Sequence, residues 1–286
     1  MTTLRHGDRS QSVRDLQRKL IARGAKIGAD GLYGDATEAA VRAYQHQADL
    51  VADGIAGPKT LASLQGADCA YLLKNADLVR AADRLGVPLA AVYALNEVES
   101  KGRGFLDNGK PVILYERHIM YARLQTIRQH YDDQEQLEQQ RDQLQQRANQ
   151  LAEQFPALVN PKFGGYVGGT AEHQRLAQAR SIDDQAALES CSWGAFQVMG
   201  FHWERLGYAS VQDFAEAMYR SESDQLEAFV RYIEADPTLL KALKSLKWAK
   251  VAELYNGPAY KRNLYDVKLQ RAFERHQDCG CGQEAA

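Results

Sequence analysis

Near the N-terminus the chain reads DGLYGDAT at residues 30–37 and DGIAGPKT at residues 53–60, a repeat that decides the local fold. Glycine in both copies permits the positive φ angles of a tight turn, and the final Thr of each copy is placed to cap or open a helix. Apolar residues recur at helical spacing before the first copy and between the two copies: Val13, Leu16 and Leu20, then Ala40, Val41 and Tyr44. The pattern therefore predicts a small unit of three helices.

The composition is that of a globular protein without a strong overall charge. At 286 residues the chain is about twice the length of a typical domain, which favours two domains of unequal size. Hydrophobic residues make up 45% of the chain, and 35 basic residues against 37 acidic ones give a net charge of −2. No global field draws such a protein to nucleic acid or to a membrane. We expect a monomer that recognises any polymer locally.

The N-terminal sequence and the cysteines indicate the compartment. Residues 1–8 contain no apolar stretch of the kind found in a signal peptide, so we expect synthesis and retention in the cytoplasm. Cys69 and Cys191 are isolated, while Cys279 and Cys281 lie in a polar tail at residues 276–286. A metal site built on the tail pair would need two more ligands, and none is nearby. We therefore predict reduced thiols, no metal and no other cofactor.

The first 65 residues resemble the peptidoglycan-binding type 1 domain. Leu4, Gly7, Gly24 and both copies of the repeat complete the pattern, whereas Ser10 stands where that family usually has a second glycine. The resemblance implies that residues 1–65 bind the bacterial cell wall, with a muropeptide or glycan held by Asp30, Tyr33, Tyr44 and Gln45. The alternative is that the repeat only shapes turns. At Ser10 we expect a local difference in the turn.

Beyond a linker at residues 66–76, residues 77–275 form the second predicted domain. The pattern is mostly helical, and PVILY at residues 111–115 is the best candidate for a strand. Residues 131–154 are rich in Gln and charged residues, with leucines spaced by seven at positions 137, 144 and 151. So short and polar a heptad predicts an inserted helix laid on the surface of the domain, with a coiled-coil partner as the alternative.

Helix geometry singles out one carboxyl group in PLAAVYALNEVESKG at residues 88–102. At about 100° per residue, Glu99 falls within about 40° of Leu95 and extends its apolar stripe, while Glu97 points about 140° away from Val92. Glu99 should therefore turn inward, at a helix C-terminus where burial and the helix dipole both raise the pKa of a carboxyl. A carboxyl that stays protonated can donate a proton to a glycosidic oxygen. The alternative is a Glu that pairs with Lys101 or Arg103.

Two further motifs follow Glu99-Ser100 along the chain: SWGAFQVMG at residues 192–200 and YNGP at residues 255–258. Together they resemble the Glu-Ser, Gly-x-x-Gln and Tyr-Asn-x-Gly signatures of lysozyme-like lytic transglycosylases. With LYERH at residues 114–118 and GGY at residues 164–166, the whole of residues 77–275 looks like the N-acetylmuramidase domain of modular phage endolysins. The fold implied is mainly α: a small three-helix wall-binding domain, then a larger, helix-dominated lysozyme-like α+β domain.

The motif residues have plausible roles in holding a sugar. Glycine at position 194 permits close approach of a backbone, and the Gln197 amide can both donate and accept hydrogen bonds. Tyr255 and Asn256 can form hydrogen bonds near the acid. The rings of Tyr166 and Trp193 suit stacking on a pyranose, although such rings are more often part of a core.

A second catalytic carboxylate is not marked by any motif. Glu116, at the end of the candidate strand, is the leading option, and a hydrolytic pair needs a separation of about 5 to 9.5 Å. Its neighbours Arg117 and His118 favour the alternative, a network that braces the site. A third interpretation is that Glu99 alone serves as acid and then base, assisted by the N-acetyl or 6-hydroxyl group of the substrate.

The predicted reaction is cleavage of the β-1,4 bond between N-acetylmuramic acid and N-acetylglucosamine, with bacterial peptidoglycan as the partner. One alternative is a lytic transglycosylase that makes the same cut and leaves a 1,6-anhydro end. Another is a wall-binding protein without activity. The lack of an export signal fits an endolysin from a phage or prophage that waits in the host cytoplasm until it is released to the wall.

Overall fold

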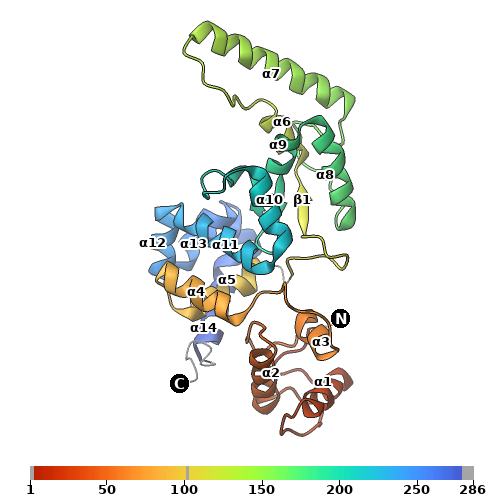
Figure 1. Ribbon diagram of the computed structural model, residues 1–286. Helices are drawn as coiled ribbons and strands as arrows, with labels where there is room; N and C mark the ends of the chain where they lie inside the picture. The colour runs from red at the N-terminus through yellow and green to blue at the C-terminus, as the bar shows by residue number, and fades with distance from the viewer. Residues whose placement is uncertain (1–2, 101–102, 279–286) are drawn as a thin grey trace. The chain divides into compact units, whose positions relative to one another are not determined.

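The computed structural model describes residues 3–100 and 103–278 and is dominated by helices (Figure 1). The chain divides into two compact units, one built from the chain before Arg103 together with the chain from Ser221 onward, the other from Arg103–Arg220. Segments far apart in the sequence thus share the first unit, which the linear order of motifs did not predict. Within the described ranges, no helix is long and apolar enough to cross a membrane.

The N-terminal part of the first unit has the three helices that the repeat predicted: α1 (Gln11–Ala22), α2 (Asp35–Gln47) and α3 (Pro58–Leu64). We call residues 3–66 the N-terminal module. Ser10 is the N-cap of α1, and its hydroxyl accepts a hydrogen bond from the Val13 amide at 3.2 Å. The serine in place of the family's glycine therefore caps a helix.

The rest of the first unit is a group of helices around α5 (Leu89–Glu99). The other members are α4 (Asn75–Leu85), α11 (Glu222–Glu234), α12 (Pro237–Lys244), α13 (Trp248–Asn256), a 3₁₀ turn η2 (Tyr260–Asn263) and α14 (Tyr265–Asp278). Both α4 and α14 pack on α5. Residues Ala90 through Leu95 are all buried, so α5 is a central helix, and its end is fixed by its neighbours.

The second unit contains a small antiparallel sheet in the order β1 (Ile113–Tyr115), β2 (Cys191–Trp193) and β3 (Val198–Met199). The register pairs Ile113 with Trp193 and Tyr115 with Cys191, so the strand predicted at residues 111–115 is confirmed for its last three residues. The helices of this unit are α6 (Arg117–Arg123), α7 (Gln134–Gln154), α8 (Thr170–Ile182), α9 (Asp184–Glu189), the 3₁₀ turn η1 (Gly200–His202) and α10 (Val211–Arg220).

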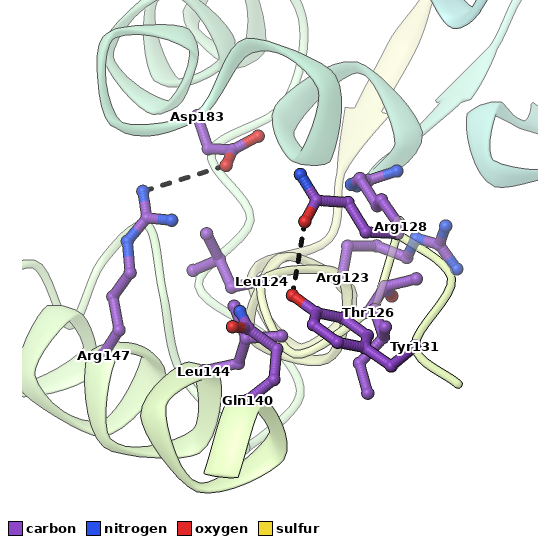
Figure 2. Close-up of a pocket in the computed structure, with 11 residues that line it drawn as sticks. Arg123, Leu124, Thr126, Arg128, Tyr131, Gln140, Leu144, Arg147 and Asp183 are labelled. Carbon is purple, nitrogen blue, oxygen red and sulfur yellow. Dashed lines mark hydrogen bonds and ion pairs between the residues drawn. The ribbon is translucent and has the colours of Figure 1, made fainter. Parts of the chain in front are cut away.

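The segment at residues 131–154 forms the long surface helix α7, capped by the Asp133 side chain. Ala148 is its buried residue. A cavity of about 230 Å³ lies where α7 meets α6 and the loop after it. In Figure 2, Arg147 of α7 points toward Asp183, 3.8 Å away, and Leu144 faces the same cavity.

The fully buried carboxylate of Glu189 neutralises two arginines that line this cavity, Arg123 and Arg128. Arg128 donates to both carboxylate oxygens at 2.8 and 2.9 Å, and Arg123 donates to Oε2 at 2.7 Å. Burial raises the pKa of Glu189, but the hydrogen bonds from Arg128, Arg123 and Trp203 outweigh it and lower the pKa to about 2. The cluster therefore stays charged at neutral pH and fixes α6 and its loop to α9.

Gly200, the first residue of η1, lies against the backbone of Leu188. A Cβ added at Gly200 would lie only 2.1 Å from the Leu188 carbonyl oxygen. Gly200→Ala should therefore lower the stability of the protein by about 3 kcal/mol, because two backbone segments would have to move apart. Thermal unfolding followed by circular dichroism measures this loss. Gly28→Ala is the control, since no atom lies within 4 Å of its added Cβ. Equal melting temperatures for the two variants would contradict the prediction.

Candidate functional site

Glu99 is the last residue of α5 and has 7% of its surface exposed. The amide nitrogen of Asn256, the last residue of α13, donates a hydrogen bond to Glu99 Oε2 at 3.0 Å. The first and third sequence motifs thus meet within the first unit, although 157 residues separate them. The result is a carboxyl group that is nearly buried and held in one orientation.

Tyr255 lies beside this carboxyl group on α13. Its ring packs edge-on against Phe229 at 5.1 Å and Tyr232 at 5.6 Å between centroids. Burial raises the pKa of the Tyr255 hydroxyl well above its usual value, and the charge of Glu99 adds to the rise. Tyr255 therefore remains a neutral hydroxyl at and around neutral pH.

Glu97 lies on the other face of α5, as the helical geometry predicted. Its carboxylate pairs with Arg275 and with His276 Nε2, the latter at 2.9 Å, both from α14. Burial raises the pKa of Glu97, but the hydrogen bond from His276 and the charge of Arg275 outweigh it and lower the pKa. Glu97 is thus an ionised residue that fixes α5 to α14.

In the second unit, Gly194 and Gln197 form the turn between β2 and β3. Both have positive φ, +69° and +52°. Gln197 donates to the Gly194 carbonyl oxygen at 2.9 Å and accepts from the Ser192 hydroxyl at 2.9 Å. One amide hydrogen and one lone pair of Gln197 therefore hold the turn together, which leaves the other hydrogen and lone pair as its capacity for a ligand.

Trp193 belongs to the core, so the expectation that it stacks on a sugar is corrected. Its side chain is 1% exposed, and its indole nitrogen donates to the Leu188 carbonyl oxygen at 3.1 Å. Phe214 and Tyr219 pack edge-on against the ring at 6.4 and 6.1 Å between centroids. With the ring covered by protein, no face remains open for a pyranose.

Glu116 and Tyr166 are brought together in the second unit. The Tyr166 hydroxyl donates to Glu116 Oε2 at 2.6 Å, and His118 Nδ1 lies 3.3 Å from the same oxygen. Arg117 does not join this group. It donates instead to the carbonyl oxygens of Pro156, Lys162 and Phe163. Glu116 thus lies in a hydrogen-bonded cluster with an aromatic neighbour.

In the N-terminal module, the first copy of the repeat is organised by Gln17 from α1. The Gln17 amide donates to Asp30 Oδ1, the Leu32 carbonyl oxygen and Thr37 Oγ1 at 2.9 to 3.0 Å. Its carbonyl oxygen accepts from the Gly31 amide at 2.8 Å, and Asp30 Oδ1 also accepts from the Leu32 amide. One glutamine therefore closes the whole loop.

Gln45 from α2 repeats this arrangement in the second copy. It donates to Asp53 Oδ1, the Ile55 carbonyl oxygen and Thr60 Oγ1, and it accepts from the Gly54 amide at 2.9 Å. Gln45 is 1% exposed. The Gln45 amide therefore closes the second copy of the repeat as Gln17 closes the first.

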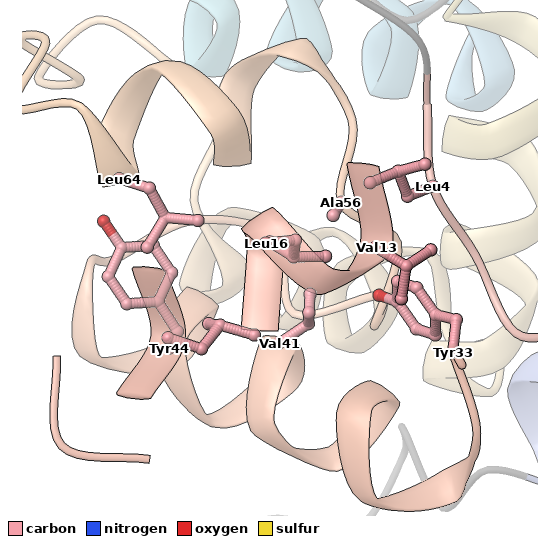
Figure 3. Packing of buried hydrophobic residues seen from close by; sticks show 9 residues of the cluster. Leu4, Val13, Leu16, Tyr33, Val41, Tyr44, Ala56 and Leu64 are labelled. Atoms are coloured by element: carbon pink, nitrogen blue, oxygen red, sulfur yellow. The ribbon is translucent and has the colours of Figure 1, made fainter. Parts of the chain in front are cut away.

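Tyr33 and Tyr44 also lie in the core of the module, where Figure 3 shows them among Leu16, Val41 and Leu64. Tyr33 is fully buried, and its hydroxyl donates to the Gly54 carbonyl oxygen at 2.7 Å. The expectation that Tyr33 contacts a ligand is therefore corrected. Tyr44 is 7% exposed, and its hydroxyl oxygen lies 2.9 Å from the hydroxyl oxygen of Ser63.

Tyr44 nevertheless reaches the edge of a groove of about 440 Å³ between the end of α1 and α2. Arg23 and Lys26 line this groove together with Ala36 and Ala39, and no acidic residue does. Asp30, the remaining expected contact, is exposed but is not among the lining residues. The groove was not predicted, because all of its lining residues except Ala36 lie outside the repeat.

Among residues 3–100 and 103–278, no group of three or more His, Cys, Asp or Glu side chains is placed to hold a metal ion. Cys191 is a free, buried thiol whose pKa is raised by burial, and Cys69 is a free, half-buried thiol. Cys279 and Cys281 lie outside the described residues.

Comparison with known families defines the class. A model of the N-acetylmuramidase family matches residues 88–277, and a model of a peptidoglycan binding domain matches residues 9–64. Since the first match covers more than half of the sequence, the chain belongs to the N-acetylmuramidase family.

The structure is similar over nearly its whole length to the crystal structure of the Burkholderia AP3 phage endolysin, with a TM-score of 0.85 and 55% identity, covering 98% of this chain and 99% of that one. Shorter similarities join it to the zinc D-Ala-D-Ala carboxypeptidase of Streptomyces albus G, 42% identical over 73 residues, and to a probable N-acetylmuramoyl-L-alanine amidase of Bacillus licheniformis, 34% identical over 120 residues. These matches cover 23% and 35% of this chain, and the chain spans about a third or less of those two curated relatives, 29% and 34%.

Gln45→Ala should lower the stability of the N-terminal module by about 2 kcal/mol, because it leaves the buried Gly54 amide without its acceptor. Unfolding in denaturant measures the loss, and binding to purified sacculi at low temperature should persist. His46→Ala, an exposed neighbour on α2, is the control. Unchanged stability with abolished wall binding would show instead that Gln45 contacts the ligand directly.

Proposed function

We propose that the chain is a peptidoglycan-degrading endolysin that cleaves the β-1,4 bond between N-acetylmuramic acid and N-acetylglucosamine, with Glu99 as the general acid. The observation that carries this proposal is the nearly buried Glu99 carboxyl group at the end of α5, oriented by Asn256. Membership of the N-acetylmuramidase family and similarity to a phage endolysin support the reaction class.

The environment of Glu99 fits proton donation. Removal from water favours the protonated form of a carboxyl, which is the form a leaving glycosidic oxygen requires. Asn256 donates to one carboxylate oxygen, so the group keeps one orientation when it becomes charged after the transfer. Tyr255 beside it stays neutral, since the pKa of its hydroxyl is raised.

The reaction follows in two steps. Glu99 gives its proton to the glycosidic oxygen, the bond from that oxygen to C1 of the N-acetylmuramic acid breaks, and positive charge develops on the sugar ring. The Glu99 carboxylate then takes a proton from water, whose oxygen bonds to C1. One water is consumed and Glu99 ends protonated, so a single carboxyl group can serve as acid and then as base.

Wall binding belongs, in this proposal, to the groove of the N-terminal module. Peptidoglycan stem peptides carry carboxylates, and the groove presents Arg23 and Lys26 without any acidic lining residue. The small side chains of the α2 alanines that line the groove leave room in it for a ligand. The family match over residues 9–64 supports this role for the module.

Glu99→Gln should reduce lysis of purified peptidoglycan by at least about 100-fold, because glutamine can accept the Asn256 hydrogen bond but has no proton to give. The rate of turbidity loss measures this, and binding to sacculi should be unchanged. Glu253→Gln, an exposed carboxylate on α13 that pairs with Lys250 at the surface, is the matched control and should retain activity. A Glu99→Gln variant with most of its activity would sink the assignment.

Mass spectrometry of the digested wall identifies the second step. Addition of one water to each cut supports the hydrolase. A 1,6-anhydro product without added water would show a lytic transglycosylase, in which the 6-hydroxyl of the muramic acid replaces water.

Replacing both Arg23 and Lys26 by Gln in the Glu99→Gln background should weaken binding to sacculi by at least about tenfold, because two charge-assisted contacts are removed. Sedimentation of protein with sacculi measures the affinity. The control is the pair Arg9→Gln and Arg18→Gln, which changes the net charge equally at exposed sites outside the groove. Equal losses in both double variants would reject the groove as the binding site.

A further inference from the structure

The loop FGGYVGG at residues 163–169 of the second unit exposes three large apolar side chains. Phe163 is 75% exposed, Val167 60% and Tyr166 45%. Single exposed apolar side chains are common, but several within one short loop mark a binding surface.

The loop is held by a buried acid and an arginine. Glu172, fully buried, accepts from the Val167 and Gly168 amides at 2.7 and 2.9 Å. Arg117 donates to the Phe163 carbonyl oxygen at 2.9 Å, and a Cβ at Gly165 would lie within 3.2 Å of its guanidinium group. The exposed side chains are thus displayed by a preorganised backbone, which lowers the entropy cost of binding.

The two aromatic rings of the loop have polar neighbours. The His118 ring lies 4.0 Å from the Phe163 ring between centroids, and the Tyr166 hydroxyl donates to Glu116. Burial and the Glu116 carboxylate raise the pKa of Tyr166 to about 12, so this hydroxyl keeps its proton. Glu116, His118, Phe163 and Tyr166 form one connected cluster, which we call the aromatic platform.

We propose that the aromatic platform binds a pyranose ring of the glycan strand, and that Glu116 is a positioning residue that orients the Tyr166 ring. A pyranose has an apolar face of C–H bonds and a polar edge of hydroxyl and acetamido groups. The platform matches this with aromatic faces beside a carboxylate and an imidazole. An acyl chain has no group that can hydrogen-bond to this polar edge, and it would remove the edge from water. This inference rests on the proposed function, since it takes the substrate to be a glycan.

Substitutions at Glu116 separate positioning from catalysis. Glu116→Gln keeps an oxygen that accepts the Tyr166 hydrogen bond, so it should recover most of the increase in KM that Glu116→Ala causes. Glu116→Ala and Tyr166→Phe each remove that bond and should raise KM severalfold with little change in kcat. A loss of kcat of about 100-fold in Glu116→Gln would overturn the inference and make Glu116 a catalytic carboxylate.

Substitution of Phe163 tests the platform itself. Phe163→Ala should raise KM about tenfold at near-constant kcat, as expected for loss of binding shared by substrate and transition state. In the Glu99→Gln background it should weaken binding of the N-acetylglucosamine tetramer by about the same factor, measured by titration calorimetry. Phe155→Ala, an exposed aromatic outside the platform, is the matched control and should change neither value.

The outcomes also separate this inference from the proposed function. If Glu99→Gln kept its activity while Phe163→Ala still weakened tetramer binding, the acid assignment would fall and the platform would stand. If Phe163→Ala left tetramer binding and KM unchanged but reduced binding to vesicles of phosphatidylethanolamine and phosphatidylglycerol, the platform would be a membrane contact and the inference would be wrong.

Discussion

Helix α5 has protein on almost every side, and this burial controls where its last carboxyl group lies. The helices α4 and α14 pack on it, and its residues from Ala90 to Leu95 are buried. Because α14 binds Glu97 through Arg275 and His276, the rotation of α5 about its axis is fixed. That rotation turns Glu99 inward to Asn256. The placement of the proposed acid is therefore a consequence of helix packing.

Local periodicity was enough to separate Glu99 from Glu97, because the angle between two side chains on a helix depends only on their spacing. It could not separate a core ring from a sugar-binding ring, so Tyr33 and Trp193 were misplaced. The loop-closing role of the two glutamines was not predicted, because Gln17 precedes its Asp by 13 residues and Gln45 by 8, so aligning the copies does not reveal it. The pairing of α5 with α14 is long-range and has no local signal.

The two copies of the repeat share the same hydrogen bonds, yet the pKa values of their aspartates are shifted in opposite directions. Asp30 and Asp53 each accept from a glutamine and from a backbone amide two residues on. Hydrogen bonds from the Leu32 amide and from Gln17 lower the pKa of Asp30, whereas burial raises the pKa of Asp53. The exposure of each carboxylate decides whether its pKa is raised or lowered. That exposure depends on tertiary packing, which the repeat does not encode.

A buried charge, that of Glu172, also stabilises the glycine-rich loop at residues 163–169. Burial raises the pKa of Glu172, but the amides of Gly168 and Val167 and the charge of Arg175 outweigh it and lower the pKa. The ionised carboxylate can therefore accept from both amides at neutral pH and hold the loop open to solvent. A loop that served only as a connection would gain more by burying its aromatic ring. Since Glu172 and Arg117 instead stabilise a backbone that keeps Phe163 in water, the loop has the form that the proposed contact with a pyranose requires.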